Sequence, residues 1–160
     1  TKSRGFITSG GLGTMGFGLG AAIGSQIGTG EHAVLVTGDG SFGMCLQELA
    51  TAVSNNVPLV ILLLNNGVLG MVRQWQTLFF DGHHSNTTLD RKTDFVALAE
   101  AFGAQGARVN TLEELDAALQ QAFSVQGPFL IDCAIDADEF VLPMLPPGGS
   151  MDDIIVKAGA

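Results

Sequence analysis

Apolar and polar positions follow one another along the chain in blocks that predict alternating strands and helices. Short runs of apolar residues are typical of strands that are buried on both faces of a parallel sheet. Such runs predict strands at 6–8, 33–37, 60–64, 106–109 and 129–134. Apolar residues spaced three or four positions apart predict helices at 14–27, 42–54, 69–80, 94–102 and 111–124. This order predicts an α/β fold, a three-layer α/β/α doubly wound parallel sheet.

Local signals refine the starts of two helices and the segments between elements. Ser41 is the expected N-cap of the second predicted helix. Thr111, with Glu114 three residues further on, has the spacing of a capping box. The polar stretch 81–93 predicts a long loop, and a proline-containing tail ends in a short amphipathic segment at 151–156.

Composition and charge narrow the classes of partner. The 160 residues fit a single domain, 1–160, and 46% of them are hydrophobic, which predicts an apolar surface in contact with another subunit or domain. The formal net charge is −9 with only 7 basic residues, so neither nucleic acid nor an anionic membrane is an expected partner. No signal-peptide pattern is present and no apolar run approaches the roughly 20 residues of a membrane span, which predicts a cytoplasmic protein. Cys45 and Cys133 are expected to be buried free thiols.

Polar residues directly follow two of the predicted strands. Asp39 lies in a Gly-Asp-Gly turn after one strand, and Asn66 lies in an Asn-Asn pair after the next. If these strands are neighbours, both side chains reach the edge of the sheet where ligands bind. A carboxylate, an amide oxygen and the Val68 carbonyl are the hard oxygen ligands that Mg²⁺ prefers, and diphosphate oxygens would complete its shell. Each motif alone is also typical of an ordinary turn, but the two together favour a magnesium–diphosphate site.

A glycine-rich turn near the start of the chain permits a second interpretation. The stretch Gly11-Leu12-Gly13-Thr14-Met15-Gly16 fits the G-x-G-x-x-G pattern of dinucleotide-binding domains. The next acidic residue, Glu31, lies in a turn instead of at the end of the following strand, which weakens that interpretation. An NAD-binding domain and a non-catalytic module of the same fold both stay open as alternatives.

The Gly-Asp-Gly and Asn-Asn motifs at this separation are similar to the thiamine diphosphate signature of the pyruvate decarboxylase and acetolactate synthase superfamily. The whole chain resembles the carboxy-terminal domain of the catalytic subunit of acetolactate (acetohydroxyacid) synthase. The stretches that carry this resemblance are TSGGLGTMG (8–16), GDGSF (38–42), QELA (47–50), LNN (64–66), GMV (70–72), QWQ (74–76) and PMLPPG (143–148). Gly20 departs from the pattern, because the family usually has proline there.

The resemblance implies thiamine diphosphate and Mg²⁺ as cofactors and assigns roles to individual residues. The metal ligands would be Asp39, Asn66 and the carbonyl of Val68. Met71, Val72 and Trp75 would line the substrate pocket, although Met15, Met71 and Val72 could instead belong to the core. The implied cofactor-binding residues are Gly13, Thr14, Met15, Gly38, Asp39, Gly40, Ser41, Asn66, Val68, Leu69, Gly70 and Met71.

The implied reaction condenses two pyruvates, or pyruvate and 2-ketobutyrate, with loss of CO₂ in branched-chain amino-acid biosynthesis. The family's activating glutamate and its FAD lie on other domains, and Glu48 is a poor substitute for that glutamate, so no catalytic residue is assigned in this chain and it is expected to be inactive alone. The resemblance also implies a homodimer or homotetramer and a possible regulatory small subunit. Another thiamine diphosphate-dependent carboligase, decarboxylase or pyruvate oxidase is the alternative. No role is assigned to Arg73, which could meet a substrate carboxylate, and His83 and His84 are expected to be solvated.

Overall fold

The computed structural model describes residues 5–157, which group into two compact units. Unit 1 consists of Thr1–Asn65 and Arg91–Ile135, and unit 2 consists of Asn66–Asp90 and Asp136–Ala160. The assignment of the whole chain to a single domain stays a prediction.

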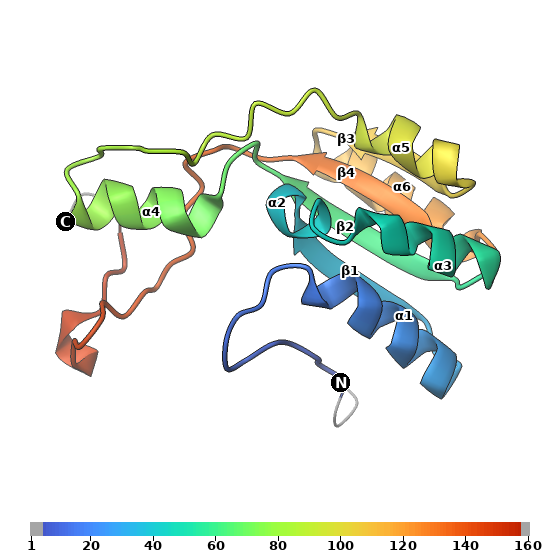
Figure 1. The fold of residues 1–160 in the computed structure, drawn as a ribbon, viewed down its shortest axis with the longest axis horizontal. Coiled ribbons are helices and arrows are strands. Elements are labelled where there is room, and N and C mark those ends of the chain that lie inside the picture. Colours follow the sequence, from blue (N-terminus) through green and yellow to red (C-terminus); the bar gives the residue numbers. More distant parts are fainter. Residues whose placement is uncertain (1–4, 158–160) are drawn as a thin grey trace. The chain divides into compact units, whose positions relative to one another are not determined.

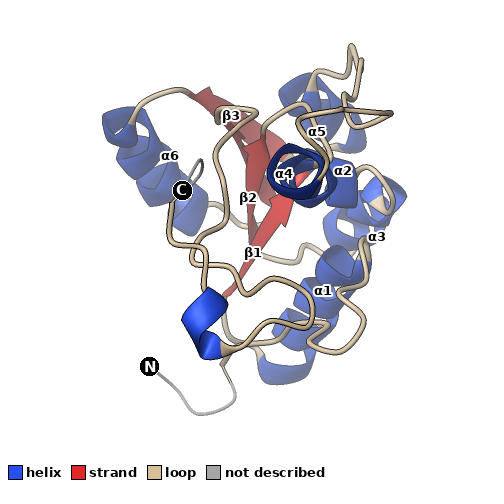
Figure 2. Cartoon of the chain, turned by 90° about the vertical axis from the view of Figure 1, so that its left-hand side faces the viewer, coloured by secondary structure: helices blue, strands red, loops and turns tan. Residues whose placement is uncertain are grey.

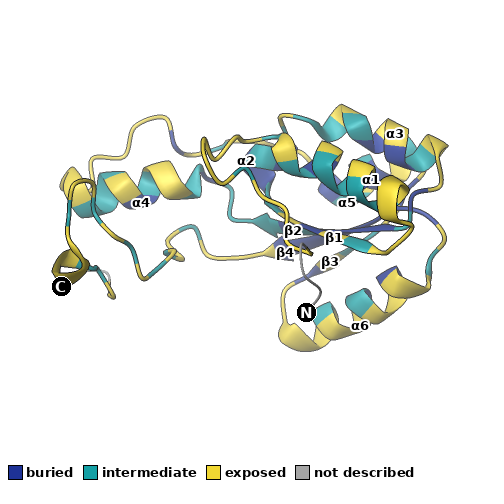
Figure 3. Cartoon of the chain, turned by 90° about the horizontal axis from the view of Figure 1, so that it is seen from below, coloured by how far each residue is buried: buried dark blue, intermediate teal, exposed yellow. Residues whose placement is uncertain are grey.

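Unit 1 is built on a sheet of four parallel strands in the order β1-β2-β4-β3 (Figure 1). The strands are β1 (Ala33–Gly38), β2 (Leu59–Asn65), β3 (Gln105–Val109) and β4 (Phe129–Ala134). Its helices are α1 (Phe17–Thr29), α2 (Asp39–Phe42), α3 (Leu49–Ser54), α5 (Phe95–Phe102) and α6 (Leu112–Ser124), with a 3₁₀ turn at Leu46–Glu48. Helices α1, α3 and α5 cover one face of the sheet and α6 covers the other (Figure 3). The predicted three-layer α/β/α arrangement is therefore confirmed.

The central strands β2 and β4 bury apolar side chains on both sides because each side faces a helix layer. In β2, Ile61 packs in the core below α1, α3 and α5, whereas its neighbour Val60 packs toward α6. In β4, Leu130 packs toward α1, α3 and α5, and Ile131 packs toward α6. All four side chains are almost completely buried. Burial on both faces accounts for the apolar residues that run through β2 and begin β4.

Three local predictions for unit 1 are wrong and one is confirmed. Residues 6–8 form no strand but an exposed segment without regular secondary structure, because a strand needs a hydrogen-bonded neighbour that a short apolar run does not itself supply. The predicted helix 42–54 is divided among α2, the 3₁₀ turn and α3, and Ser41 lies inside α2 instead of capping a helix. The capping box at Thr111 is present, with the Glu114 N–H donating to the Thr111 hydroxyl over 3.2 Å.

Unit 2 contains one regular helix, α4 (Gly70–Phe79), and two extended segments. The first, called here the loop, comprises residues 80–90 and returns to the start of α4 through an antiparallel bridge between Val68 and Thr88. The second, called the arm, comprises residues 136–157. An antiparallel bridge between Met144 and Ile155, called the neck, joins two points of the arm. The arm carries a 3₁₀ turn at Met151–Asp153 where an amphipathic segment was predicted. In the described part of the chain no helix is long and apolar enough to cross a membrane.

Glycines of α1 give a test of this packing. Gly20, at the position where the acetolactate synthase family usually has proline, is exposed, and a Cβ added there meets nothing within 4 Å. We expect Gly20→Ala to raise the free energy of unfolding by about 0.5–1 kcal/mol, because alanine loses less conformational entropy in a helix. A Cβ at Gly18 would lie 2.7 Å from Cδ1 of the buried Leu35, so Gly18→Ala is expected to lower the stability by about 1 kcal/mol. Urea denaturation measures both, and equal effects would contradict this packing of α1 on β1.

Candidate cofactor site

The two polar motifs follow the ends of neighbouring strands. Strands β1 and β2 pair in parallel, with Gly38 opposite Leu64. Asp39 comes directly after β1 and is the first residue of α2, and Asn66 comes directly after β2. The expectation that the two strands are adjacent is confirmed. In open parallel sheets this edge, at the carboxyl ends of the strands, is where ligands bind.

A hydrogen bond joins the first glycine-rich turn to the Gly-Asp-Gly turn. The N–H of Gly16 donates to the Ser41 hydroxyl over 3.0 Å. Gly16 has a φ of 85°, and a Cβ there would lie 3.3 Å from Cβ of Met44. A side chain at this position is therefore disfavoured both by the backbone conformation and by the close contact. Ser41 therefore positions the turn that contains Gly13, Thr14 and Met15. The sequence-based interpretation missed this role because Ser41 and Gly16 lie in different elements.

Met15 is not a core residue, because 42% of it is exposed. Gly13 and Thr14 beside it are exposed as well. The turn itself is held by Ser9, whose carbonyl accepts from the Gly13 N–H over 2.8 Å and whose hydroxyl accepts from the Thr14 N–H over 3.1 Å. The turn thus presents backbone and an apolar side chain outside the core, as a cofactor-binding segment would.

Asp39 is a buried carboxylate, only 3% exposed. Its backbone carbonyl accepts from the Gly43 N–H over 2.9 Å and from Nη1 of Arg91 over 3.0 Å. Arg91 occupies the space that a Cβ at Gly43 would need. A carboxylate is withdrawn from water only where other charged or polar groups compensate it. Arg91 was not among the predicted residues, and no motif marks it.

The first asparagine of the Asn-Asn pair has a structural contact, distinct from any ligand role. Nδ2 of Asn65 donates to Oδ1 of the buried Asp132 over 2.9 Å, and Oδ2 of Asp132 accepts from Nε of Arg108 over 3.1 Å. Nη2 of Arg108 donates to Asp94 over 2.9 Å, and Asp94 caps α5. These bonds link β2, β4, β3 and α5 and fix the end of β2 directly before Asn66.

The pKa of Asp94 lies below its ordinary value, first because the N–H of Ala97 donates to its carboxylate and then because the Arg108 guanidinium lies beside it. The ionised form of Asp94 is therefore the one that caps α5. Cys45 and Cys133 are free thiols as predicted, and burial raises the pKa of both. Cys133 is buried, but Cys45 is only partly so.

The turn after β2 presents oxygen atoms in the manner that a metal site needs. Oδ1 of Asn66 accepts from the N–H of Val68 over 3.2 Å, which fixes the amide while leaving a second lone pair on the oxygen. The bridge to the loop uses the N–H of Leu69, which donates to Thr87 over 2.7 Å, and the carbonyl of Gly67, which accepts from Leu89 over 2.8 Å. The carbonyl of Val68 takes no part in that bridge. The oxygens of this turn thus fit the predicted ligand set.

Helix α4 exposes four apolar side chains and buries a polar one, while Leu78 is half-buried. Met71, Val72, Trp75 and Phe79 are 50%, 48%, 37% and 38% exposed, whereas Gln74 is 2% exposed. Trp75 and Phe79 pack edge to face with ring centroids 5.6 Å apart. The alternative that Met71 and Val72 belong to the core is therefore wrong. Spacings of three and four place these side chains along one face of the helix, as a ligand-binding wall requires.

Arg73 and His84 are both engaged in contacts within unit 2. Arg73 forms an ion pair with Asp138, with Nε 2.6 Å from Oδ1, and its Nη1 lies 3.0 Å from Nδ1 of His84. The Arg73 guanidinium holds the pKa of Asp138 below its ordinary value. Nε2 of His84 lies 2.9 Å from the Thr77 hydroxyl. His84 is thus bonded to α4 and is not simply solvated.

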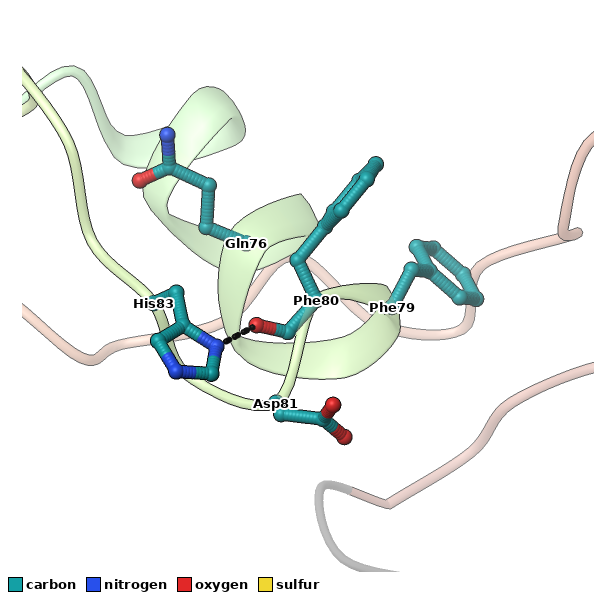
Figure 4. A pocket seen from close by; sticks show the side chains of 5 residues that line it. All are labelled: Gln76, Phe79, Phe80, Asp81 and His83. Atoms are coloured by element: carbon teal, nitrogen blue, oxygen red, sulfur yellow. Dashed lines mark hydrogen bonds between the residues drawn. The ribbon is translucent and has the colours of Figure 1, made fainter.

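An open hollow of about 410 Å³ lies at the end of α4 (Figure 4). It is lined by Gln76, Phe79, Phe80, Asp81 and His83, and Nδ1 of His83 lies 3.0 Å from the Phe80 carbonyl. None of the predicted cofactor or substrate residues lines it. Within residues 5–157, no group of three or more His, Cys, Asp and Glu side chains could hold a metal.

Comparison with known proteins decides between the cofactor classes. The family described as "Thiamine pyrophosphate enzyme, C-terminal TPP binding domain" matches residues 1–133. The chain belongs to this family. The resemblance noted from the motifs is confirmed, and the dinucleotide-binding interpretation of G-x-G-x-x-G is wrong.

Acetolactate synthase subunits are similar to this member of the family over nearly its whole length. The chain is 47% identical over 158 residues to the acetolactate synthase isozyme 2 large subunit of Escherichia coli, covering 98% of this chain and 29% of that protein. It is 49% identical over 151 residues to the mitochondrial acetolactate synthase catalytic subunit of Saccharomyces cerevisiae, covering 94% of this chain and 22% of that protein. The chain therefore spans less than a third of the length of these relatives.

A solved structure is similar in fold. The thiamine diphosphate-dependent 4-hydroxybenzoylformate decarboxylase of Rhodococcus jostii RHA1 matches with a TM-score of 0.73 and 33% sequence identity. The match covers 79% of this chain and 24% of that one. The predicted fold of a thiamine diphosphate-binding domain is thereby confirmed.

Gly70 provides a test of the Asn66 amide. A Cβ at Gly70 would lie 2.8 Å from Nδ2 of Asn66, so an alanine there pushes the amide out of its position. We expect Gly70→Ala to weaken magnesium-dependent binding of thiamine diphosphate by about tenfold, the range seen when a ligand loses its support. Isothermal titration at fixed Mg²⁺ measures this affinity. Gly67→Ala is unsuitable as a control because the φ of 67° at Gly67 disfavours any side chain. Gly20→Ala is a suitable control, because a Cβ there meets nothing within 4 Å, and it should leave the cofactor affinity unchanged.

Proposed function

We propose that this chain is the carboxy-terminal, cofactor-binding part of the catalytic subunit of an acetolactate synthase. The reaction condenses two pyruvates, or pyruvate and 2-ketobutyrate, with loss of CO₂ in branched-chain amino-acid biosynthesis. The observation that carries the proposal is the exposed apolar face of α4, with Met71, Val72 and Trp75 in a chain 47% identical to an acetolactate synthase. An apolar helix face that its own fold leaves uncovered is suited to line a cofactor and substrate pocket.

The chain's own residues would hold the cofactor through a magnesium ion. Asp39, Asn66 and the Val68 carbonyl are the ligands we propose, because each follows the end of β1 or β2 and offers a hard oxygen. The remaining proposed cofactor contacts are Gly13, Thr14, Met15, Gly38, Gly40, Ser41, Leu69, Gly70 and Met71. When bound, thiamine diphosphate supplies a thiazolium that accepts the electron pair released by decarboxylation.

Several further proposals concern the protein beyond this chain. We propose that the activating glutamate and an FAD lie on other domains of a longer protein, since this chain covers 29% of its E. coli relative. Homodimer or homotetramer assembly and a regulatory small subunit are proposed on the same basis. Location in the cytoplasm stays a prediction, and among the relatives the yeast protein is named mitochondrial and two tobacco proteins chloroplastic.

Thermal denaturation with added ligands tests the cofactor part of the proposal. We expect thiamine diphosphate with Mg²⁺ to raise the melting temperature of the full-length protein, and NAD to leave it unchanged, because a ligand stabilises only the state that binds it. Acetolactate formation from pyruvate then tests the reaction. Stabilisation without acetolactate formation would favour another carboligase, decarboxylase or oxidase of the same cofactor class. The 160-residue chain alone is expected to form no acetolactate.

A further inference from the structure

Helix α4 is held in unit 2 by its polar side chains. Neither of the two buried apolar clusters found in the described residues contains a residue of α4, the loop or the arm. The contacts that fix the loop and the arm on the helix are hydrogen bonds and an ion pair from Arg73, Gln74, Gln76 and Thr77. This reverses the usual arrangement of an amphipathic helix, in which the apolar face packs on the protein and the polar face meets water.

Gln74 attaches the arm through two bonds to one residue. Its Oε1 accepts from the N–H of Val141 over 2.8 Å, and its Nε2 donates to the carbonyl of Val141 over 3.1 Å. The same Nε2 lies 3.2 Å from Sδ of Met144. Met144 and Ile155 exchange two backbone bonds of 2.9 Å at the neck of the arm. One buried amide therefore fixes the neck, and with it the arm, against α4.

Gln76 makes the same kind of contact with the loop. Its Oε1 accepts from the N–H of Ser85 over 3.0 Å, and its Nε2 donates to the Ser85 carbonyl over 3.2 Å. Arg73 joins both segments, because it binds Asp138 in the arm and His84 in the loop. Gln76 is more exposed than Gln74, so its bonds compete more directly with water. The two glutamines are thus a matched pair with different partners.

The apolar face of α4 depends on these polar contacts for its position. Met71 and Trp75 flank Gln74 in sequence, and all three lie within two turns of one helix. A helix of ten residues is only marginally stable without tertiary contacts, so what fixes its flanking segments also fixes the face it presents. Loss of the Gln74 bonds would free the arm and let that face move.

We propose that Gln74 is a positioning residue for the 2-ketoacid pocket: it holds the arm on α4 and thereby holds Met71, Val72 and Trp75 in place, without touching the substrate. This inference rests on the proposed acetolactate synthase function. It assigns to a buried glutamine an effect on substrate affinity that is separate from cofactor binding.

The test uses the full-length protein and compares Gln74→Met with Gln76→Met. Methionine has nearly the length of glutamine but cannot make the two backbone bonds, so packing is retained while the attachment is lost. Hydrogen exchange of the Val141 amide reports on the Gln74 bond, and exchange of the Ser85 amide reports on the Gln76 bond. KM and kcat for pyruvate, and the affinity for thiamine diphosphate with Mg²⁺, are measured on the same samples.

For Gln74→Met we expect faster exchange at Val141 with unchanged exchange at Ser85. We expect KM for pyruvate to rise by about tenfold, since small misplacements of a binding wall cost up to about a hundredfold, while the cofactor affinity stays within about twofold. Gln76→Met should accelerate Ser85 alone. Gln74→Glu, which still accepts from the Val141 N–H, should protect that amide and give a smaller rise in KM.

Two outcomes would overturn the inference. In the first, Val141 exchanges faster in Gln74→Met but KM is unchanged. In the second, KM for pyruvate rises and cofactor affinity falls together, which indicates general unfolding of the site. Absence of acetolactate formation by the unsubstituted protein would instead overturn the proposed function, and that measurement comes first.

Discussion

Replacing Asp39 by alanine is expected to lower the affinity of the full-length protein for thiamine diphosphate, at fixed Mg²⁺, by about a hundredfold or more. Asp39 supplies the only carboxylate of the proposed ligand set, and it lies at the start of α2 with 3% of its surface exposed. An amide and a carbonyl alone bind Mg²⁺ weakly, because neither carries a charge. Isothermal titration calorimetry with thiamine diphosphate measures the loss.

A second carboxylate provides the control. Asp116 is exposed on α6, where it accepts a hydrogen bond from Gln120 over 2.9 Å. Asp116→Ala removes the same charge from the same unit and is expected to leave cofactor affinity unchanged. Equal losses in the two variants would show that net charge, and not a specific ligand, determines the affinity. An unchanged affinity in Asp39→Ala would remove Asp39 from the metal site.

Alanine substitutions of the two adjacent asparagines are expected to change different properties, cofactor affinity in one case and stability in the other. Asn66→Ala should reduce magnesium-dependent cofactor affinity by about ten- to a hundredfold with little change in stability, because it removes a proposed ligand. Asn65→Ala should instead lower the free energy of unfolding by about 2 kcal/mol, because Oδ1 of the buried Asp132 loses its donor. Calorimetric titration and urea denaturation of both variants separate the two effects.

Arg108→Met serves as the control for the loss of stability expected in Asn65→Ala. It removes the other donor to Asp132 and should destabilise the protein to a similar degree without altering the residues around Asn66. If Asn65→Ala lost cofactor affinity while retaining stability, the assignment of ligand and support between the two asparagines would be wrong. Loss of cofactor affinity therefore identifies the ligand, and loss of stability identifies the structural residue.

Most of unit 1 could be predicted because its signals are local. Apolar residues run through β2 and begin β4, and burial on both faces favours such runs; the one polar side chain inside β4, Asp132, is paired with Asn65 and Arg108. The Thr111 capping box spans only four positions of one helix, so its spacing is visible in the sequence. Placement of Asp39 and Asn66 after adjacent strands followed from the usual order of a doubly wound sheet. Figure 2 shows the strands in red between α6 on one side and α1, α3 and α5 on the other.

The missed features depend on contacts between residues distant in sequence. Ser41 was expected to cap its own helix, but its hydroxyl accepts from Gly16 in another element. Arg91 reaches the carbonyl of Asp39, and Gln74 reaches Val141, in each case across a long stretch of chain. No periodicity or spacing records such bonds. The predicted strand at 6–8 failed for the converse reason, since its local pattern lacked a partner strand among the described residues.

The polar attachment of the loop and arm to α4 makes unit 2 a region of low local stability. Its described residues contain no buried apolar cluster, and such a region opens at a smaller free energy than a well-packed sheet, without global unfolding. A ligand that needs the closed form binds with an apparent affinity scaled by the fraction of molecules in which unit 2 is closed. Temperature, denaturant and substitutions in the arm would therefore tune affinity for a molecule they never contact.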